Sequence, residues 1–455
     1  MSTTDAVEPS GGCCCGVGPR READIAWNDA SHKRIVEVAV DGLKAYCDGG
    51  GTSQHAALVT NFCTPELALE FKAAMLRGLY DADYKVPYAG YHLHDEYFTW
   101  HPHFYDPDTG VNYLRTDWTA LSDGRRYFNL SVEYARRAFK IGLGKWHLGH
   151  MYEKAGYYLG LSLHYLTDLT QPFHAANHNN DGIDMKHSKF EAYAEKCVLD
   201  GYFNGFAPLT DGDLAVDGIA NAGDVLIEVA REMKSVYVRD VKPIADKKGG
   251  HDAWGPEANE ALSKSLMRAP RITARYLCYW ARAVRDEVPV DPFTWYRIYR
   301  TTPAGQEEVR LDGGYYKSGS SAGGRSQFFF HYNEDGTCTL ATKDYPRNPW
   351  MEYRAAFGKM YISEYKDAPS PPPWQTRFRV VRETSGAYWF FAPSDDEVVG
   401  VDNNRDLIRW IPTDPSTQVF LLEPIGRMTQ AEIDAIRAAW PKFGLPWWGQ
   451  EMGGA

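Results

Sequence analysis

The chain has 455 residues, of which 44% are hydrophobic and 24% are charged, and its formal net charge is −11. This length exceeds the roughly 250–300 residues at which a single hydrophobic core stops growing, so we expect two domains. No run of about 18 uncharged apolar residues could span a bilayer. The acidic balance argues against a strongly cationic surface for duplex nucleic acid.

The first 26 residues predict a flexible tail or propeptide. They contain no apolar h-region, so they do not form an ordinary signal peptide, and export would need another route or another start. Three consecutive cysteines, Cys13–Cys15, could hold a soft metal, carry a lipid or simply lie in a tail rich in Gly and Ser. The other cysteines stand singly and specify no disulfide framework.

The hydrophobic period is helical from about Ser31 to Arg285. Ile35, Val38, Ala39 and Leu43, for example, recur at the spacing of one helix face. We therefore expect the first half of the chain to be mostly α.

The composition changes after VPVDPFTW at 288–295, where two prolines predict a linker. Short aromatic and β-branched runs follow, and Asp335-Gly336 and Ser385-Gly386 each separate two of them, which is a hairpin signal. Residues 429–440 predict a closing helix with Thr429 as its N-cap. The second half is therefore expected to be mostly β.

A weak repeat runs through the β half. Tyr316 and Tyr361 stand in similar contexts, and Phe330, Phe378 and Phe420 recur at comparable intervals of about 45 residues. Three units of that length predict a β-trefoil, with a β-sandwich as the alternative.

Polar groups interrupt the apolar segment LSLHYLTDLTQPFHAANH. His164 and Asp168 are four residues apart and share a helix face, which Gly156 and Gly160 continue one and two turns earlier, so another element or ligand can approach closely. His174 follows a break at Gln171-Pro172. Three such groups in an apolar helix predict a binding site.

Further metal-competent groups support this prediction. His187 and Glu191 form another pair four residues apart, His103 lies in HPHFYDPD, and Asp83 lies in GLYDADY. His32 is expected ahead of the first helix, as is Trp27. Asp81 is expected to be solvated.

The donor types indicate a chemistry. His and Asp/Glu without cysteine are typical of catalytic rather than structural zinc, and more than four ligands imply more than one ion. Neighbouring zinc ions suit phosphoester hydrolysis.

The segments GLYDADYKVPY, HFYDPDTG, YYLGLSLHYLTDLTQPFHAANH and HSKFEAYAEK resemble the zinc-dependent bacterial phospholipase C family, which includes phosphatidylcholine-preferring enzymes and clostridial α-toxin. The resemblance covers about residues 31–285 and implies an α-helical domain with three zinc ions. It assigns Asp83, His103, His164 and Asp168 to one ion, His174, His187 and Glu191 to the second, and His32, Asp168 and the backbone of Trp27 to the third.

Trp27 departs from the family pattern. The resemblance implies that this tryptophan is the mature N-terminus, because its free amine is a ligand, whereas 26 residues precede it here, and its interval to His32 is shorter than the family's usual spacing. We therefore expect three zinc ions, or two if Trp27 is not a free N-terminus.

The resemblance also implies a reaction and a substrate. Phosphatidylcholine-type lipids would be hydrolysed to diacylglycerol and a phosphorylated headgroup, with Asp83 either binding or deprotonating the attacking water. Tyr84 and Trp100 fall where aromatic walls surround choline in similar enzymes, although the family more commonly has Phe at the second position.

The β half lies outside the region of resemblance. Its trefoil-like architecture alone points to docking to a glycan or a surface, with a stabilising appendage as the alternative, and the resemblance implies secretion of the chain. The rival functions are a zinc-dependent single-strand nuclease of the same helical plan and a binding protein whose zinc ions only staple the helices. The expected divisions are a tail at 1–26, the zinc phospholipase C domain at 27–287, a β-rich domain at 293–425, and a C-terminal helix and tail at 426–455.

Overall fold

The computed structural model describes seventeen separate segments of the chain. They are 29–63, 71–84, 101–141, 148–179, 185–285, 290–302, 305–312, 315–319, 326–333, 337–343, 350–356, 359–365, 377–383, 385–392, 398–401, 407–409 and 419–439. Cys13–Cys15, Trp27, Trp100 and the side chain of Tyr84 lie outside the described residues.

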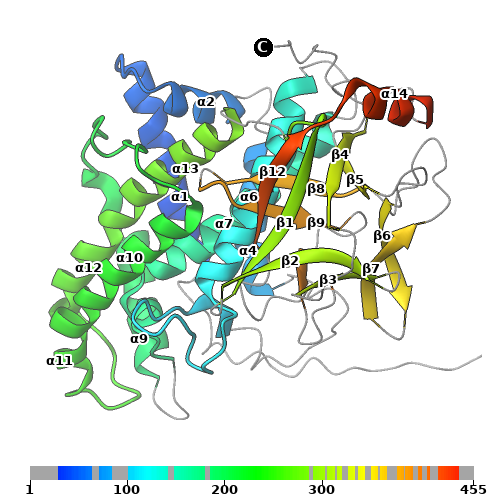
Figure 1. Cartoon of the computed structure of the whole chain (residues 1–455). Coiled ribbons are helices and arrows are strands. Elements are labelled where there is room, and N and C mark those ends of the chain that lie inside the picture. Colours follow the sequence, from blue (N-terminus) through cyan, green and yellow to red (C-terminus); the bar gives the residue numbers. More distant parts are fainter. Residues whose placement is uncertain are drawn as a thin grey trace, which may run out of the picture.

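The first half is helical, as the apolar period predicts, and Figure 1 shows its helices gathered on one side of the molecule. None of the described helices is long and apolar enough to cross a membrane. The helices are α1 (Asp29–Asp48), α2 (Gln54–Phe62), α4 (Phe71–Tyr84), α6 (Ala120–Ile141), α7 (Leu148–Leu169), α8 (Pro172–Ala175), α9 (Lys186–Leu199), α10 (Ala222–Val236), α11 (Lys242–Ala245), α12 (Asn259–Leu266) and α13 (Arg268–Arg285), with short turns η1 (His101–His103), η2 (Tyr202–Gly205), η3 (Tyr237–Val241) and η4 (Pro256–Ala258).

Glycines let α4 lie directly against α7. A Cβ atom on Gly156 would stand 2.1 Å from the carbonyl oxygen of Phe71, and one on Gly160 would stand 2.0 Å from that of Met75. Backbone cannot move aside as a flexible side chain can, so only glycine fits at these positions. The glycine face of α7 therefore allows α4 to pack closely against it. This packing places the C-terminal end of α4 beside His164.

The second half is an antiparallel sheet of short strands. Its strands are β1 (Thr294–Thr302), β2 (Gly305–Asp312), β3 (Tyr315–Ser318), β4 (Phe328–Tyr332), β5 (Cys338–Thr342), β6 (Trp350–Ala356), β7 (Lys359–Tyr365), β8 (Arg379–Arg382), β9 (Tyr388–Phe391), β10 (Val399–Val401), β11 (Leu407–Arg409) and β12 (Phe420–Arg427).

The strand pairings close a ring. β1 pairs with β4, β4 with β5, β8 with β9, β9 with β12, and β12 with β1. A bridge between Cys338 and Phe378 links β5 to the start of β8. The remaining strands form the hairpins β2–β3, β6–β7 and β10–β11. All of these described strands therefore belong to one connected antiparallel sheet.

The turn prediction at Ser385-Gly386 and the cap prediction at Thr429 are confirmed, whereas Asp335-Gly336 lies outside the described residues. Ser385 and Gly386 connect the paired strands β8 and β9, and Gly386 has a φ of 87°. Helix α14 (Gln430–Ala439) follows Thr429, whose hydroxyl accepts the N–H of Glu432 at 3.3 Å while the Glu432 carboxylate accepts the N–H of Thr429 at 2.8 Å. This reciprocal pair is a capping box.

The two halves share buried contacts along α6. Arg125 of α6 donates two hydrogen bonds to Glu383, which directly follows β8, and Asn129 donates a third at 3.1 Å. Trp389 of β9 donates its indole N–H to the same carboxylate at 3.0 Å and belongs to the apolar core of the helical half. The β half is therefore packed against the helices rather than tethered at a distance.

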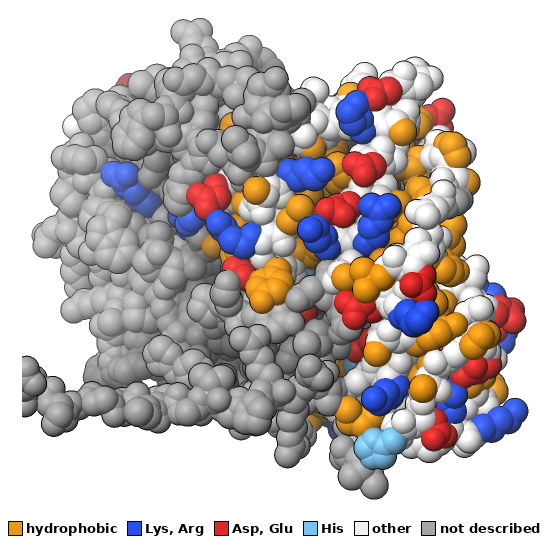
Figure 2. Space-filling view, turned by 180° about the vertical axis from the view of Figure 1, so that it is seen from behind, with side chains coloured by type: hydrophobic (Ala, Val, Ile, Leu, Met, Phe, Trp, Pro, Cys, Tyr) orange, Lys and Arg blue, Asp and Glu red, His pale blue; other side chains and the backbone are white. Residues whose placement is uncertain are grey.

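The outer surface of the helical half carries charges of both signs. Seen from behind, its basic and acidic side chains are interspersed over the described part of that face (Figure 2). Several form pairs one helical turn apart, such as Lys242 with Asp246 at 2.7 Å. Such a surface is typical of a solvated helix face.

Candidate metal centre

Six separate elements place side chains that can bind a metal ion in one buried cluster. All of these residues are at most 6% exposed. They are His32 from α1, Asp83 from the last turn of α4, His103 from η1, His164 and Asp168 from α7, His174 from α8, and His187 and Glu191 from α9.

Asp168 lies between two groups of imidazoles. Its Oδ2 is 2.8 Å from Nδ1 of His103 and 3.3 Å from Nε2 of His164. Its Oδ1 is 3.5 Å from Nδ1 of His174 and 3.6 Å from Nε2 of His32. One carboxylate thus faces histidines from four different elements, which is the geometry of a bridging group.

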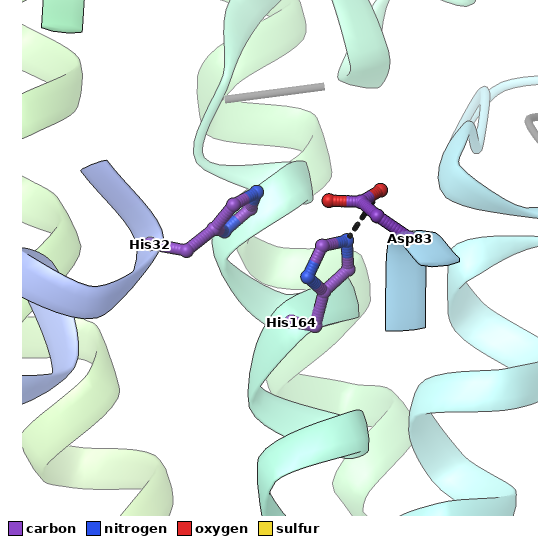
Figure 3. A group of neighbouring side chains, drawn as sticks. All are labelled: His32, Asp83 and His164. Atoms are coloured by element: carbon purple, nitrogen blue, oxygen red, sulfur yellow. Dashed lines mark ion pairs between the residues drawn. The ribbon is translucent and has the colours of Figure 1, made fainter. Parts of the chain in front are cut away.

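Asp83 completes one side of this cluster, as Figure 3 shows. Its Oδ1 lies 3.4 Å from Nε2 of His164 and 3.8 Å from Nδ1 of His103. His32 reaches in from α1, and its ring stacks on that of His164 with centroids 4.2 Å apart. Both carboxylate oxygens of Asp83 are buried and accept no regular hydrogen bond from the described residues. A carboxylate in this state needs a positive partner.

His174, His187 and Glu191 form a second group. Glu191 Oε1 is 2.8 Å from Nε2 of His187 and 3.2 Å from Nε2 of His174. His187 and Glu191 are one turn apart in α9, and both side chains lie beside His174 of the short helix α8. The spacing of four residues therefore performs the role expected from the sequence, because it places both donors on one face.

Hydrogen bonds behind the cluster fix the orientation of its imidazoles. Nδ1 of His164 donates to the carbonyl of Leu79 at 2.8 Å, and Nδ1 of His174 donates to the carbonyl of His103 at 2.9 Å. The Thr167 hydroxyl donates to the carbonyl of Leu163 and accepts from Nδ1 of His32 at 2.6 Å. Each partner sets the tautomer in which Nε2 carries a lone pair towards the cluster.

The charges of the cluster strongly perturb one another. Burial raises the pKa of Asp168 to about 7 against the opposing effect of His164 and His174. Burial disfavours the His164 imidazolium, but the carboxylates of Asp83 and Asp168 outweigh it and raise the pKa of His164 to about 9. Burial also lowers the pKa of His103 to about 3. Carboxylates this crowded are stabilised by added positive charge, which a divalent cation supplies.

Two sequence expectations are wrong. His32 does not precede the first helix. Helix α1 begins at Asp29, so His32 lies in the first turn of that helix. Asp81 is not solvated but 6% exposed, and it accepts a hydrogen bond from Tyr157 at 3.3 Å. The tight packing of α4 on α7 buries Asp81 on the side that faces Tyr157 of α7.

The donor set fits zinc. Three groups each have ligand atoms within 4.8 Å of one another: His32 with Asp83 and His164, His103 with His164 and Asp168, and His174 with His187 and Glu191. The first two groups share His164. Imidazole nitrogens and carboxylate oxygens without thiolates are the ligands of catalytic zinc sites. Sequence reasoning did not single out Thr167 or Gln171 behind this set, because neutral polar side chains give no metal-ligand signal.

Comparisons with known proteins agree with this geometry. No protein-family model matches the chain. The chain is 31% identical over 293 residues to a phospholipase C of Bacillus cereus, and the match covers 62% of this chain and 91% of that protein. It is 27% identical over 220 residues to a phospholipase C of Listeria monocytogenes, covering 48% of this chain and 68% of that protein.

Among solved structures, the α-toxin of Clostridium absonum aligns with 87% of this chain and 98% of its own, at 20% identity and a TM-score of 0.43. The Bacillus cereus match spans nearly the whole of that relative at more than 30% identity. The chain therefore belongs to the phospholipase C family.

Proposed function

We propose that this protein is a zinc-dependent phospholipase C that hydrolyses phosphatidylcholine-type phospholipids to diacylglycerol and a phosphorylated headgroup. The observation that carries the proposal is the buried Asp168 carboxylate, whose two oxygens face different groups of imidazoles 2.8–3.6 Å away. Membership of the phospholipase C family supports the same reaction class.

Three zinc ions are proposed for the fully assembled site. The short distances from Asp168 to His103 and His164, and from Glu191 to His174 and His187, support the first two ions, and two ions are expected if the amine of Trp27 does not take part. The proposed ligands are Asp83, His103, His164 and Asp168 for the first ion, His174, His187 and Glu191 for the second, and His32, Asp168 and Trp27 for the third.

Asp83, Asp168 and the imidazoles have different proposed roles in the reaction. When bound, zinc neutralises phosphodiester oxygens and makes water a better nucleophile near neutral pH. Asp83 is the proposed proton acceptor for the attacking water, since its oxygens are buried yet accept no regular hydrogen bond from the described residues. Asp168 and the fixed imidazoles would hold the zinc ions in one arrangement, so that the reacting phosphate is bound in one orientation and much of the entropic cost of the reaction is removed.

The substrate and location belong to the same proposal. Tyr84 and Trp100 would form aromatic walls around a choline headgroup, where each ring contributes ~0.5–2 kcal/mol of cation–π attraction. The protein would act on membrane surfaces after secretion. Residues 27–287 would form the catalytic domain, 293–425 a β-trefoil that docks to a glycan or surface, and 1–26 and 426–455 the terminal segments.

Metal analysis combined with a substrate panel tests the function. The purified full chain should contain two to three zinc ions and hydrolyse phosphatidylcholine vesicles, and EDTA should abolish hydrolysis until zinc is restored. Active protein with metal content near zero would refute the proposal. Cleavage of single-stranded DNA alone would favour the nuclease, and bound zinc with no hydrolysis of any phosphodiester would favour a zinc-stapled binding protein.

A further inference from the structure

Gln171 connects three of the candidate ligand residues without belonging to the donor set itself. It lies between α7 and α8 and is fully buried. Its backbone N–H donates to the carbonyl of Asp168 at 2.8 Å. Its side-chain oxygen accepts the N–H of Phe173, and its amide nitrogen donates to Glu191 Oε1 at 2.8 Å.

These contacts determine how the amide is turned. The backbone N–H of Phe173 can only donate, so the amide must present its oxygen there and its NH₂ group to Glu191. The amide oxygen also makes Gln171 the N-cap of α8, the single helical turn that carries His174. The Gln171 side chain therefore caps the helix that carries His174 and also donates a hydrogen bond to Glu191.

The contact with Glu191 falls on the oxygen that faces the imidazoles. Glu191 Oε1 lies 2.8 Å from His187 Nε2 and 3.2 Å from His174 Nε2. A neutral N–H donor on this oxygen restricts rotation of the carboxylate without adding a charge that would compete with a cation. Glutamine suits this place better than a basic residue, because a cation there would neutralise Glu191.

We propose that Gln171 is a positioning residue for the metal position formed by His174, His187 and Glu191, acting through its hydrogen bond to Glu191. The inference rests on the proposed zinc binding and assigns a residue outside the ligand set. Hydrogen-bond partners of ligands typically change metal affinity by ~10–100-fold when removed. The effect should be confined to this one position, since Gln171 donates to no other ligand side chain among the described residues.

Two substitutions of Gln171 distinguish its hydrogen bond to Glu191 from its role as the N-cap of α8. Gln171→Met removes both contacts, whereas Gln171→Ser removes the donor to Glu191 but supplies a hydroxyl that can cap α8. Ser131→Ala is the matched control: Ser131 is equally buried and donates to the carbonyl of Ala155 at 2.7 Å, but it does not contact the cluster. Zinc affinity of each full-length, zinc-loaded protein is measured by competition with a chromophoric zinc chelator, and folding by thermal unfolding.

Both Gln171 variants should show one zinc per chain bound ~10–100-fold more weakly, with the remaining zinc unchanged. Ser131→Ala should lower the melting temperature and leave every zinc affinity as in the wild type. Wild-type affinity in Gln171→Ser, or equal weakening of all zinc ions, would overturn the inference and leave Gln171 as a helix cap. A wild-type chain without tightly bound zinc would instead overturn the proposed function, and this inference with it.

Discussion

Asp168 and Asp81 are both buried aspartates of the helical half, yet they have different surroundings. Asp168 faces four imidazoles, whereas Asp81 accepts a hydrogen bond from Tyr157. Asp168→Asn removes the negative charge and one acceptor oxygen, so hydrolysis should fall roughly 100-fold or more and bound zinc should decrease. Asp81→Asn should keep its zinc and most of its activity. Equal losses in metal content and turnover would show that Asp168 has no bridging role.

Sequence could predict the donors but not the groups that orient them. His164 with Asp168, and His187 with Glu191, are recognisable because a spacing of four residues places both on one helix face. Thr167 and Gln171 have partners 135 and 20 positions away, in α1 and α9, and their neutral side chains occur in any helix. The orientation of an imidazole therefore depends on tertiary packing that no local pattern encodes.

Whether the α-amino group of Trp27 is a zinc ligand can also be tested at the scale of one residue. An amide nitrogen within a chain is a poor ligand, whereas a terminal amine with a pKa of ~7.7–8.0 can donate its lone pair. A chain beginning at Trp27 should therefore bind one more zinc, or turn over faster, than the chain beginning at Met1. Zinc stoichiometry and hydrolysis measured on both proteins decide the matter. Identical values would remove the amine from the site.

At the scale of elements, the close contact between α4 and α7 determines how near Asp83 lies to His164. The sequence showed the glycine face of α7 but not its partner, because helix pairing depends on both surfaces. In the β half, the short aromatic and β-branched runs predicted strands, and the described strands form one antiparallel sheet. The hairpin at Ser385-Gly386 was predictable because its turn requires a positive φ.

Gly160→Ala tests this helix contact. The added Cβ would lie 2.0 Å from the carbonyl oxygen of Met75, so α4 must move away from α7 and carry Asp83 with it. We expect a loss of ~1–3 kcal/mol or more in the free energy of unfolding, together with weaker zinc binding. Gly42→Ala is the control, because its Cβ would meet only the flexible side chains of Leu209 and Phe206 at 3.1 Å or more. Thermal unfolding and zinc titration that leave Gly160→Ala unchanged would contradict the tight contact.

At the scale of the whole molecule, the two halves meet through an ion pair between the half-buried Arg125 and the buried Glu383, which local sequence patterns could not reveal. Arg125 and Glu383 are 258 positions apart, and neither belongs to a recognisable motif. The Glu383 carboxylate also accepts hydrogen bonds from Asn129 and Trp389, and its side chain is 2% exposed. Such an arrangement couples the stability of the helices to that of the strands.

Removing one partner of this pair should therefore destabilise the whole chain. Glu383→Ala removes the carboxylate that accepts both hydrogen bonds from the Arg125 guanidinium, so we expect a loss of ~3–5 kcal/mol in the free energy of unfolding. Arg125→Met combined with Glu383→Leu should recover part of that loss, because an apolar pair of similar volume carries no stranded charge. Glu423→Ala is the control, since Glu423 is 54% exposed and its loss should change stability by less than about 0.5 kcal/mol.

The unfolding transition itself shows whether the junction couples the halves. Calorimetry of the wild type should give one transition, because the helical core includes Val381, Trp389 and Phe391 from the strands and neither half can unfold without exposing them. In Glu383→Ala the β half should unfold first, at a lower temperature than the zinc-stabilised helices, which metal binding holds together. Two well-separated transitions in the wild type would mean that the Arg125–Glu383 pair joins the halves without linking their stability.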